Sequence, residues 1–371
     1  MSEPINKPGH QPESYDPKDM PEIMRLAERA QTQAEKPSGG CKIIPGLSKV
    51  DFSDGGEYVQ AVISALGVLG EKLDSGYVSV VSGTAFRTFI DKAYEKGGYN
   101  HGNYTIGNTM SMWTVEHTFR MLGYRASVHY RSNFETDKAL IVRSIDRGVP
   151  VVTLNGIVDT SEACVITGYD RGGDVLLGHS AMWDDQDCEK DPTGCFRKSN
   201  WHKQEIFSEV GAIVIIEEKL AKPSKEAVYH ETLRTAIRLI QGTDCQAADC
   251  RAYMGLRAHE AYADQMTRAR QGRNIGNAYF NMMCNRMMYI EKKCAAPFFV
   301  DMGNEALAEI YRQIERLDLE CNKIIPWTGN RKKLLKRPKR VAKFCDRLLA
   351  IRDLERQALE IMQAELQRVE A

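Results

Sequence analysis

The chain of 371 residues is long enough for about two domains, and its core needs neither metal nor disulfide bonds. Lysine plus arginine and aspartate plus glutamate both number 50, which leaves no net charge to attract nucleic acid. The ten cysteines lack paired spacing and no apolar run approaches the roughly 18–20 residues that cross a bilayer, so we expect a cytoplasmic protein without membrane contact.

Three parts follow one another along the chain. Residues 1–40 are polar, charged and rich in proline, which predicts a flexible N-terminal arm. A first domain is expected over residues 41–218 and an all-helical domain over residues 219–371. The composition changes between them at residues 217–224, which we interpret as a linker.

Helical patterns open the first domain. Asp54 is a suitable cap for a helix that begins at residue 55 or 56, carries apolar residues at helical spacing and ends at residue 69 before Gly70. A second helix is predicted over residues 110–122, and Gly123 ends it.

The pattern then becomes β from residue 125 to residue 217, and only helices are predicted after the linker. The long loop after the fourth predicted strand carries Trp183, which favours a functional or covering role for that loop. The strands are predicted at residues 126–130, 149–154, 162–169, 174–177 and 210–216, and the helices around residues 233–240, 254–266, 279–290, 307–321 and 348–361.

Several motifs resemble one family when they are taken in order. Residues 148–154 and 161–170 are similar to the central strands of the papain-like fold of C39-type cysteine peptidases. Residues 77–87 resemble relatives of the butirosin biosynthesis H protein, and residues 255–262 are similar to the Gly-Leu-x-Ala-Tyr-x-x-Trp helix of that family. The resemblance implies an α+β chain, with a papain-like domain built on an antiparallel sheet and an all-helical domain after it.

The same resemblance implies acyl transfer, but the catalytic positions of the family carry other residues here. Relatives place a cysteine at the start of the first helix, a histidine on a facing strand and an Asn or Asp on the next strand. Residues 54–61 contain no Cys, Ser or Thr, the histidine position is Glu162, and the third position falls near His179. Thiol chemistry by the family mechanism is therefore not expected.

Three residues are the catalytic candidates. Glu162 and His179 are interpreted as acid and base groups, although Glu162 could equally be a solvated carboxylate at a strand end and His179 a hydrogen-bonded loop residue. Cys164 is either a relocated nucleophile or a buried strand cysteine. No zinc spacing links His179 to Glu57, His117 or another distant ligand, so neither a metal nor a cofactor is expected.

Five residues are the substrate-binding candidates. Ser82 and Arg87 lie in a turn that could hold an anionic substrate, or they could serve the core and an ion pair. Tyr58 lies on the first helix, Trp183 in the long loop and His259 in the helical motif, around the cleft that the resemblance implies between the two domains.

Two functions remain open. The first is a papain-fold acyltransferase, or an amide-forming or amide-cleaving enzyme, of bacterial specialised metabolism with a divergent site. It would act on a small-molecule or carrier-protein-bound acyl substrate. The alternative is a non-catalytic pseudoenzyme that binds a small molecule or peptide in the cleft. The basic segment 331–343 is either a solvated helix face or a contact for a partner, nucleic acid is not an expected partner, and self-association as a homo-oligomer stays open.

Overall fold

The computed structural model describes the chain in ranges separated by gaps. Residues 41–371 form one compact unit, which is the unit described below. Within the described residues, no helix is both long and apolar enough to span a membrane. The described residues are 40–45, 47, 56–92, 95, 113–130, 132–154, 157, 163–180, 189–190, 195–202, 212–243, 252–270, 289–325 and 336–370.

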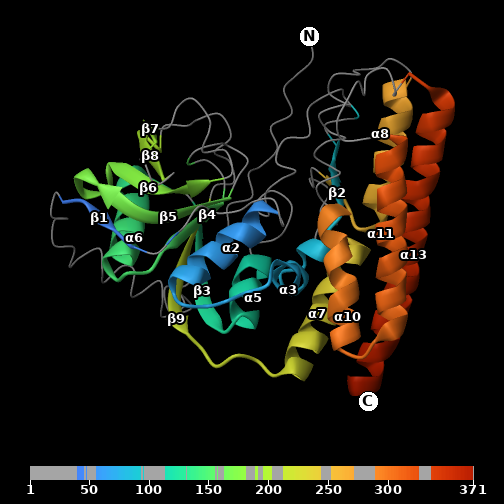
Figure 1. The fold of residues 1–371 in the computed structure, drawn as a ribbon, viewed down its shortest axis with the longest axis horizontal. Coiled ribbons are helices and arrows are strands. Elements are labelled where there is room, and N and C mark those ends of the chain that lie inside the picture. Colours follow the sequence, from blue (N-terminus) through green and yellow to red (C-terminus); the bar gives the residue numbers. More distant parts are fainter. Residues whose placement is uncertain are drawn as a thin grey trace, which may run out of the picture. The chain divides into compact units, whose positions relative to one another are not determined.

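An antiparallel sheet forms the first part of this unit (Figure 1). Its strands follow the order β3-β9-β4-β5-β6-β8-β7, and β1 pairs with β5. The strands are β1 (Lys42–Ile43), β3 (Tyr124–Tyr130), β4 (Val151–Leu154), β5 (Ala163–Asp170), β6 (Val175–Ser180), β7 (Glu189–Lys190), β8 (Phe196–Ser199) and β9 (Ala212–Lys219).

Helices cover both faces of this sheet, because its central strands are apolar on both sides. Val165 and its neighbours on alternate positions pack with α2 (Glu57–Val68) and α5 (Trp113–Met121) in one core cluster. Cys164 and Ile166 pack with α6 (Phe134–Asp146) in a second cluster on the opposite face. Two short helical segments, α3 (Ser75–Val81) and η2 (Thr84–Phe86), follow α2.

The rest of the unit is mostly helical. Helices α8 (Leu256–Arg270) and α11 (Glu305–Ile324) each pack along α13 (Pro338–Glu370), which also packs on α7 (Lys225–Gln241) (Figure 1). A small sheet pairs β2 (Phe89–Asp91) with β10 (Ala252–Met254). The helical elements are η4 (Arg171–Gly173), α7 (Lys225–Gln241), α8 (Leu256–Arg270), η7 (Glu291–Cys294), α10 (Ala295–Asp301), α11 (Glu305–Ile324) and α13 (Pro338–Glu370).

These observations confirm the predicted α+β class, with an antiparallel sheet in the N-terminal half and helices after it. Both predicted glycine stops are also confirmed. Gly70 and Gly123 follow α2 and α5 with φ of +88° and +83°, a conformation that glycine adopts at little cost. Asp54, the predicted cap of the first helix, lies outside the described residues.

Three expectations about elements were wrong. The predicted β region contains α6, whose buried positions include Asp137 and Ser144 and therefore give a weak apolar pattern. The predicted helix-only region contains β10, which is held by its pairing with a distant strand. The linker begins at Leu220, because β9 continues to Lys219, where it pairs with Tyr124.

The core does not stop at the predicted domain border. Phe86 from the first part lies 5.6 Å from the Tyr311 ring and 6.1 Å from the Phe299 ring, both in the helical part. One hydrophobic cluster contains residues from both sides of residue 218. The division at that residue stays a prediction, and the helical part reaches directly to the elements around α2.

Candidate functional site: two buried charge clusters joined by one short helix

A carboxylate from the helical part lies at the N-terminus of α2. The backbone N–H of Gly56 donates a hydrogen bond to Oε1 of Glu291 at 2.8 Å, across 235 residues of sequence. A negative charge is favourable there, because the first amides of a helix have no partner within it and carry a partial positive charge. A Cβ at residue 56 would overlap Oε1 and lie 3.2 Å from the carboxyl carbon, so this contact requires glycine.

Glu291 is almost completely removed from water. Its exposed fraction is 3%, and its Oε2 atom has no hydrogen-bond partner among the described residues. A buried carboxylate costs free energy unless opposite charge or hydrogen bonds compensate it. The compensation that the structure describes comes from Gly56 and from the nearby cation Arg87.

Arg87 is the buried cation of this cluster. It follows η2, which packs against η7, and it is 6% exposed. Burial lowers the pKa of Arg87, whereas the charges of Glu291 and Glu57 act to raise it. Its guanidinium also lies 5.7 Å from the centre of the Phe89 ring. The predicted anion-binding arginine therefore lies beside carboxylates of its own chain.

The turn before Arg87 is closed by its own hydroxyl groups. The Ser82 hydroxyl donates to the carbonyl oxygen of Ser79 at 3.2 Å, and the Thr84 hydroxyl donates to the same oxygen at 3.1 Å. Ser82 and Thr84 are buried. These hydrogen bonds hold the conformation of the turn that leads into Arg87. Ser82, a predicted substrate-binding residue, is engaged in this turn.

The next residue of η7 enters a second buried cluster in the helical part. Lys292 from η7 forms an ion pair with Oε1 of Glu355 on α13, and the Nε2 atom of His259 on α8 lies 2.7 Å from Oε2 of Glu355. The hydroxyl of Tyr289 lies 2.7 Å from Nδ1 of His259. Lys292, His259 and Glu355 are fully buried.

Glu355 is the carboxylate at the centre of this second cluster. Burial alone would raise the pKa of Glu355, but Lys292 and His259 outweigh burial and lower it to about 2. Glu355 is therefore ionised and accepts from both Lys292 and the Nε2–H of His259. Nδ1 of His259 lies against the Tyr289 hydroxyl, and burial together with Glu355 raises the pKa of Tyr289 well above its usual value.

The sheet separates two of the predicted catalytic residues. In the antiparallel pairing of β5 with β6, His179 lies opposite Val165 and Ser180 lies opposite Cys164. Directly opposed residues share a face. His179 therefore belongs to the face that α2 covers, whereas Cys164 belongs to the face that α6 covers. Both residues are buried, with exposed fractions of 5% and 0%.

The other predicted residues divide into three groups. Glu162 and Trp183 lie outside the described residues. Tyr58 lies in the first turn of α2 with its side chain in the core, and burial raises its pKa. His259 belongs to the second cluster, apart from the α2 terminus. Within the described ranges, no group of three or more His, Cys, Asp or Glu residues could hold a metal ion.

Three central residues were missed by the sequence analysis: Glu291, Lys292 and Glu355. Each lies in a helical pattern where charged residues are ordinarily solvated, and their partners are distant in sequence. One signal was present, because Glu291 and Lys292 stand only a few residues before the apolar run 295–300.

Comparison with protein-family models gave no match for this chain, and comparison with curated proteins gave no significant match. The class of this protein is therefore defined by its fold and by the arrangement of its candidate site. The chain is an α+β protein with an antiparallel sheet, a helical C-terminal region and two buried charge clusters that η7 joins.

Proposed function

We propose that the chain is a papain-like protein that binds an acyl- or amide-containing small molecule or peptide non-covalently, without forming an acyl–enzyme bond. The contact between Gly56 and Glu291 is the observation that carries this proposal. It lies at the start of the helix that packs on the central strands, where relatives in the resembling family place their nucleophile.

The physical reason lies in what covalent acyl transfer needs at that position. A helix N-terminus supports the reaction by lowering the pKa of a thiol and by donating N–H groups to an oxyanion. Here the Gly56 N–H already donates to a carboxylate, and the negative charge of Glu291 opposes both a thiolate and an oxyanion. Non-covalent binding needs neither a thiolate nor an oxyanion at this position.

A second function is supported by the position of His179. This buried histidine belongs to the α2-covered face of the sheet, one strand away from the strand that Glu162 precedes. An enzyme of bacterial specialised metabolism that makes or breaks acyl and amide bonds would then use His179 as its acid or base. Cys164 lies on the opposite face and would take no part.

One experiment separates these functions. The full chain is incubated with a panel of acyl thioesters, peptides and amines, and is followed by native and intact-protein mass spectrometry. Binding without turnover supports the first proposal. Turnover that is lost in His179→Ala, but kept in the control Cys164→Ser, supports the second. An acyl adduct covalently attached to the protein would overturn both.

A further inference from the structure

The contact between Glu291 and α2 has the composition of an occupied anion site. A helix of 12 residues presents its first amides, one of them donates to the carboxylate at 2.8 Å, and a buried guanidinium provides the opposite charge. Such helix termini bind carboxylates and phosphates in many proteins. In this protein the bound carboxylate belongs to the chain itself.

A second observation indicates that the site is built for a carboxylate. Only 3% of Glu291 is exposed to water, yet only one of its two carboxylate oxygens has a hydrogen-bond partner among the described residues. A residue that served only the fold would cost less free energy as a neutral amide or an apolar side chain. The buried charge accepts from the amide of Gly56 and interacts electrostatically with Arg87.

The glycine at residue 56 supports the same conclusion. Its φ of −66° and ψ of 154° are accessible to every residue, so the backbone does not require glycine there. The requirement comes from the carboxylate, because any Cβ would overlap its Oε1 atom. The glycine therefore leaves the space that Oε1 of Glu291 occupies at this helix terminus.

We propose that the first turn of α2 and Arg87 form a carboxylate-binding site, and that Glu291 is its built-in occupant, in competition with the carboxylate of a ligand. The contact is autoinhibitory in this sense: a ligand carboxylate gains the site only when η7 withdraws Glu291. The inference uses the same Gly56–Glu291 contact as the proposed function and goes beyond it, because it assigns a ligand group to this site and does not require the absence of acyl transfer.

The test is chemical rescue of the full chain. Glu291→Ala removes the occupant and leaves space, so its melting temperature is expected to fall by several degrees. Formate or acetate should restore at least half of that loss in a saturable way, whereas chloride at equal ionic strength should not. Formate is expected to bind this variant about tenfold or more tightly than the unchanged chain.

Two matched controls locate the effect. Glu291→Gln keeps the volume of the side chain and removes its charge, so formate should find no space and no response is expected. Glu309→Ala removes a half-exposed, arginine-paired carboxylate on α11 and should also give no response. The amide of Gly56 gives a local readout, because formate should restore its protection from hydrogen exchange in Glu291→Ala only.

If Glu291→Ala does not fold in chloride, the yield of folded protein on refolding in formate replaces the melting temperature as the readout. A response to formate that is equal in Glu291→Ala, Glu291→Gln and the unchanged chain would overturn the inference, as would no difference from chloride. Rescue by formate in a chain that also forms an acyl adduct would keep this inference and overturn the proposed function.

Discussion

Glu291 and Lys292 are adjacent in η7, yet their side chains end in two different buried clusters. Glu291 accepts from Gly56 at the start of α2, and Lys292 pairs with Glu355 on α13. One turn of 3-10 helix therefore ties the helix that covers the sheet to the long C-terminal helix. A change in either cluster has a direct structural route to the other.

Lys292→Met tests the energetic weight of the second cluster. The substitution leaves the ionised Glu355 buried with His259 as its remaining partner, and removal of one partner from a buried pair costs about 3–5 kcal/mol. Chemical denaturation measures this cost. Tyr289→Phe is the milder comparison, because it removes one neutral donor and should cost about 1–3 kcal/mol. Equal costs for the two variants would contradict the assigned charges.

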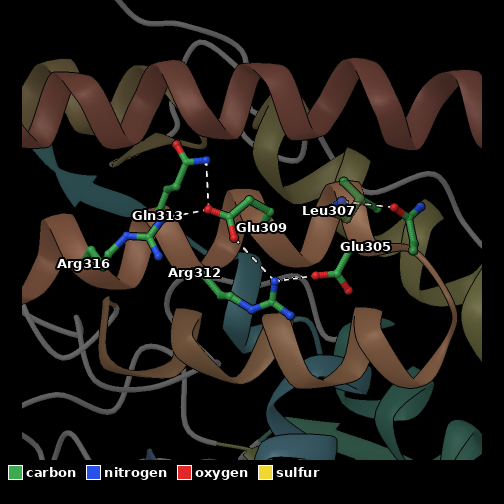
Figure 2. Close-up of polar contacts among 7 residues, drawn as sticks. Glu305, Leu307, Glu309, Arg312, Gln313 and Arg316 are labelled. Carbon is green, nitrogen blue, oxygen red and sulfur yellow. Dashed lines mark hydrogen bonds and ion pairs between the residues drawn. The ribbon is translucent and has the colours of Figure 1, made fainter.

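The exposed pairs of α11 should behave differently from the buried clusters. Figure 2 shows Glu309 facing Arg312, Gln313 and Arg316. Oε1 of Glu309 lies 2.7 Å from Nη2 of Arg316. Water and salt screen such pairs. We expect Glu309→Ala to leave the denaturation midpoint unchanged within error at physiological salt. A loss of stability as large as that of Lys292→Met would show that solvent exposure does not decide how much an ion pair of this protein contributes to stability.

His117 predicts a pH dependence of stability. Its Nδ1 faces Arg120 and its Nε2 faces Thr235, both at 3.2 Å. Burial lowers the pKa of His117 from 6.5 to about 4, Arg120 adds to this effect, and Glu231 opposes it. Between these values the unfolded chain binds a proton that the folded chain does not. Stability is therefore lost as the pH falls from 6.5 to 4, by roughly 3 kcal/mol.

His117→Gln isolates this contribution. The free energy of unfolding is measured by denaturation at pH 7, 5.5 and 4 for both chains. The difference between the unchanged chain and the variant should shrink by roughly 3 kcal/mol between pH 7 and pH 4. Parallel pH profiles would mean that His117 titrates alike in the folded and unfolded states.

Local signals predicted a large part of the fold. Gly70 and Gly123 ended helices as expected, because a left-handed residue after a helix is a local requirement. The apolar runs that became β4 and β5 were equally readable, because both faces of these strands are buried. Helix α6 was not predicted, because the polar residues Asp137 and Ser144 occupy buried positions that are apolar in a clear helical pattern.

The buried charges could not be predicted, for a different reason. Glu291 meets Gly56 across 235 residues, and His259 meets Glu355 across 96. No local pattern distinguishes a buried glutamate from a solvated one in a helical segment. Arg87 was predicted as an anion-binding residue from its turn, but its neighbours Glu291 and Glu57 became visible only in the folded chain.

The account depends most on the carboxylate at the start of α2, and a double-mutant cycle between Gly56 and Glu291 tests it directly. Gly56→Ala should destabilise the unchanged chain more than it destabilises Glu291→Ala, by about 1 kcal/mol or more, because the added methyl group then meets no carboxylate. Gly67→Ala is the control within the same helix. Its Cβ would meet no atom within 4 Å, so it should stabilise by about 0.5–1 kcal/mol in both backgrounds. An equal cost of Gly56→Ala with and without Glu291 would contradict the contact and the account built on it.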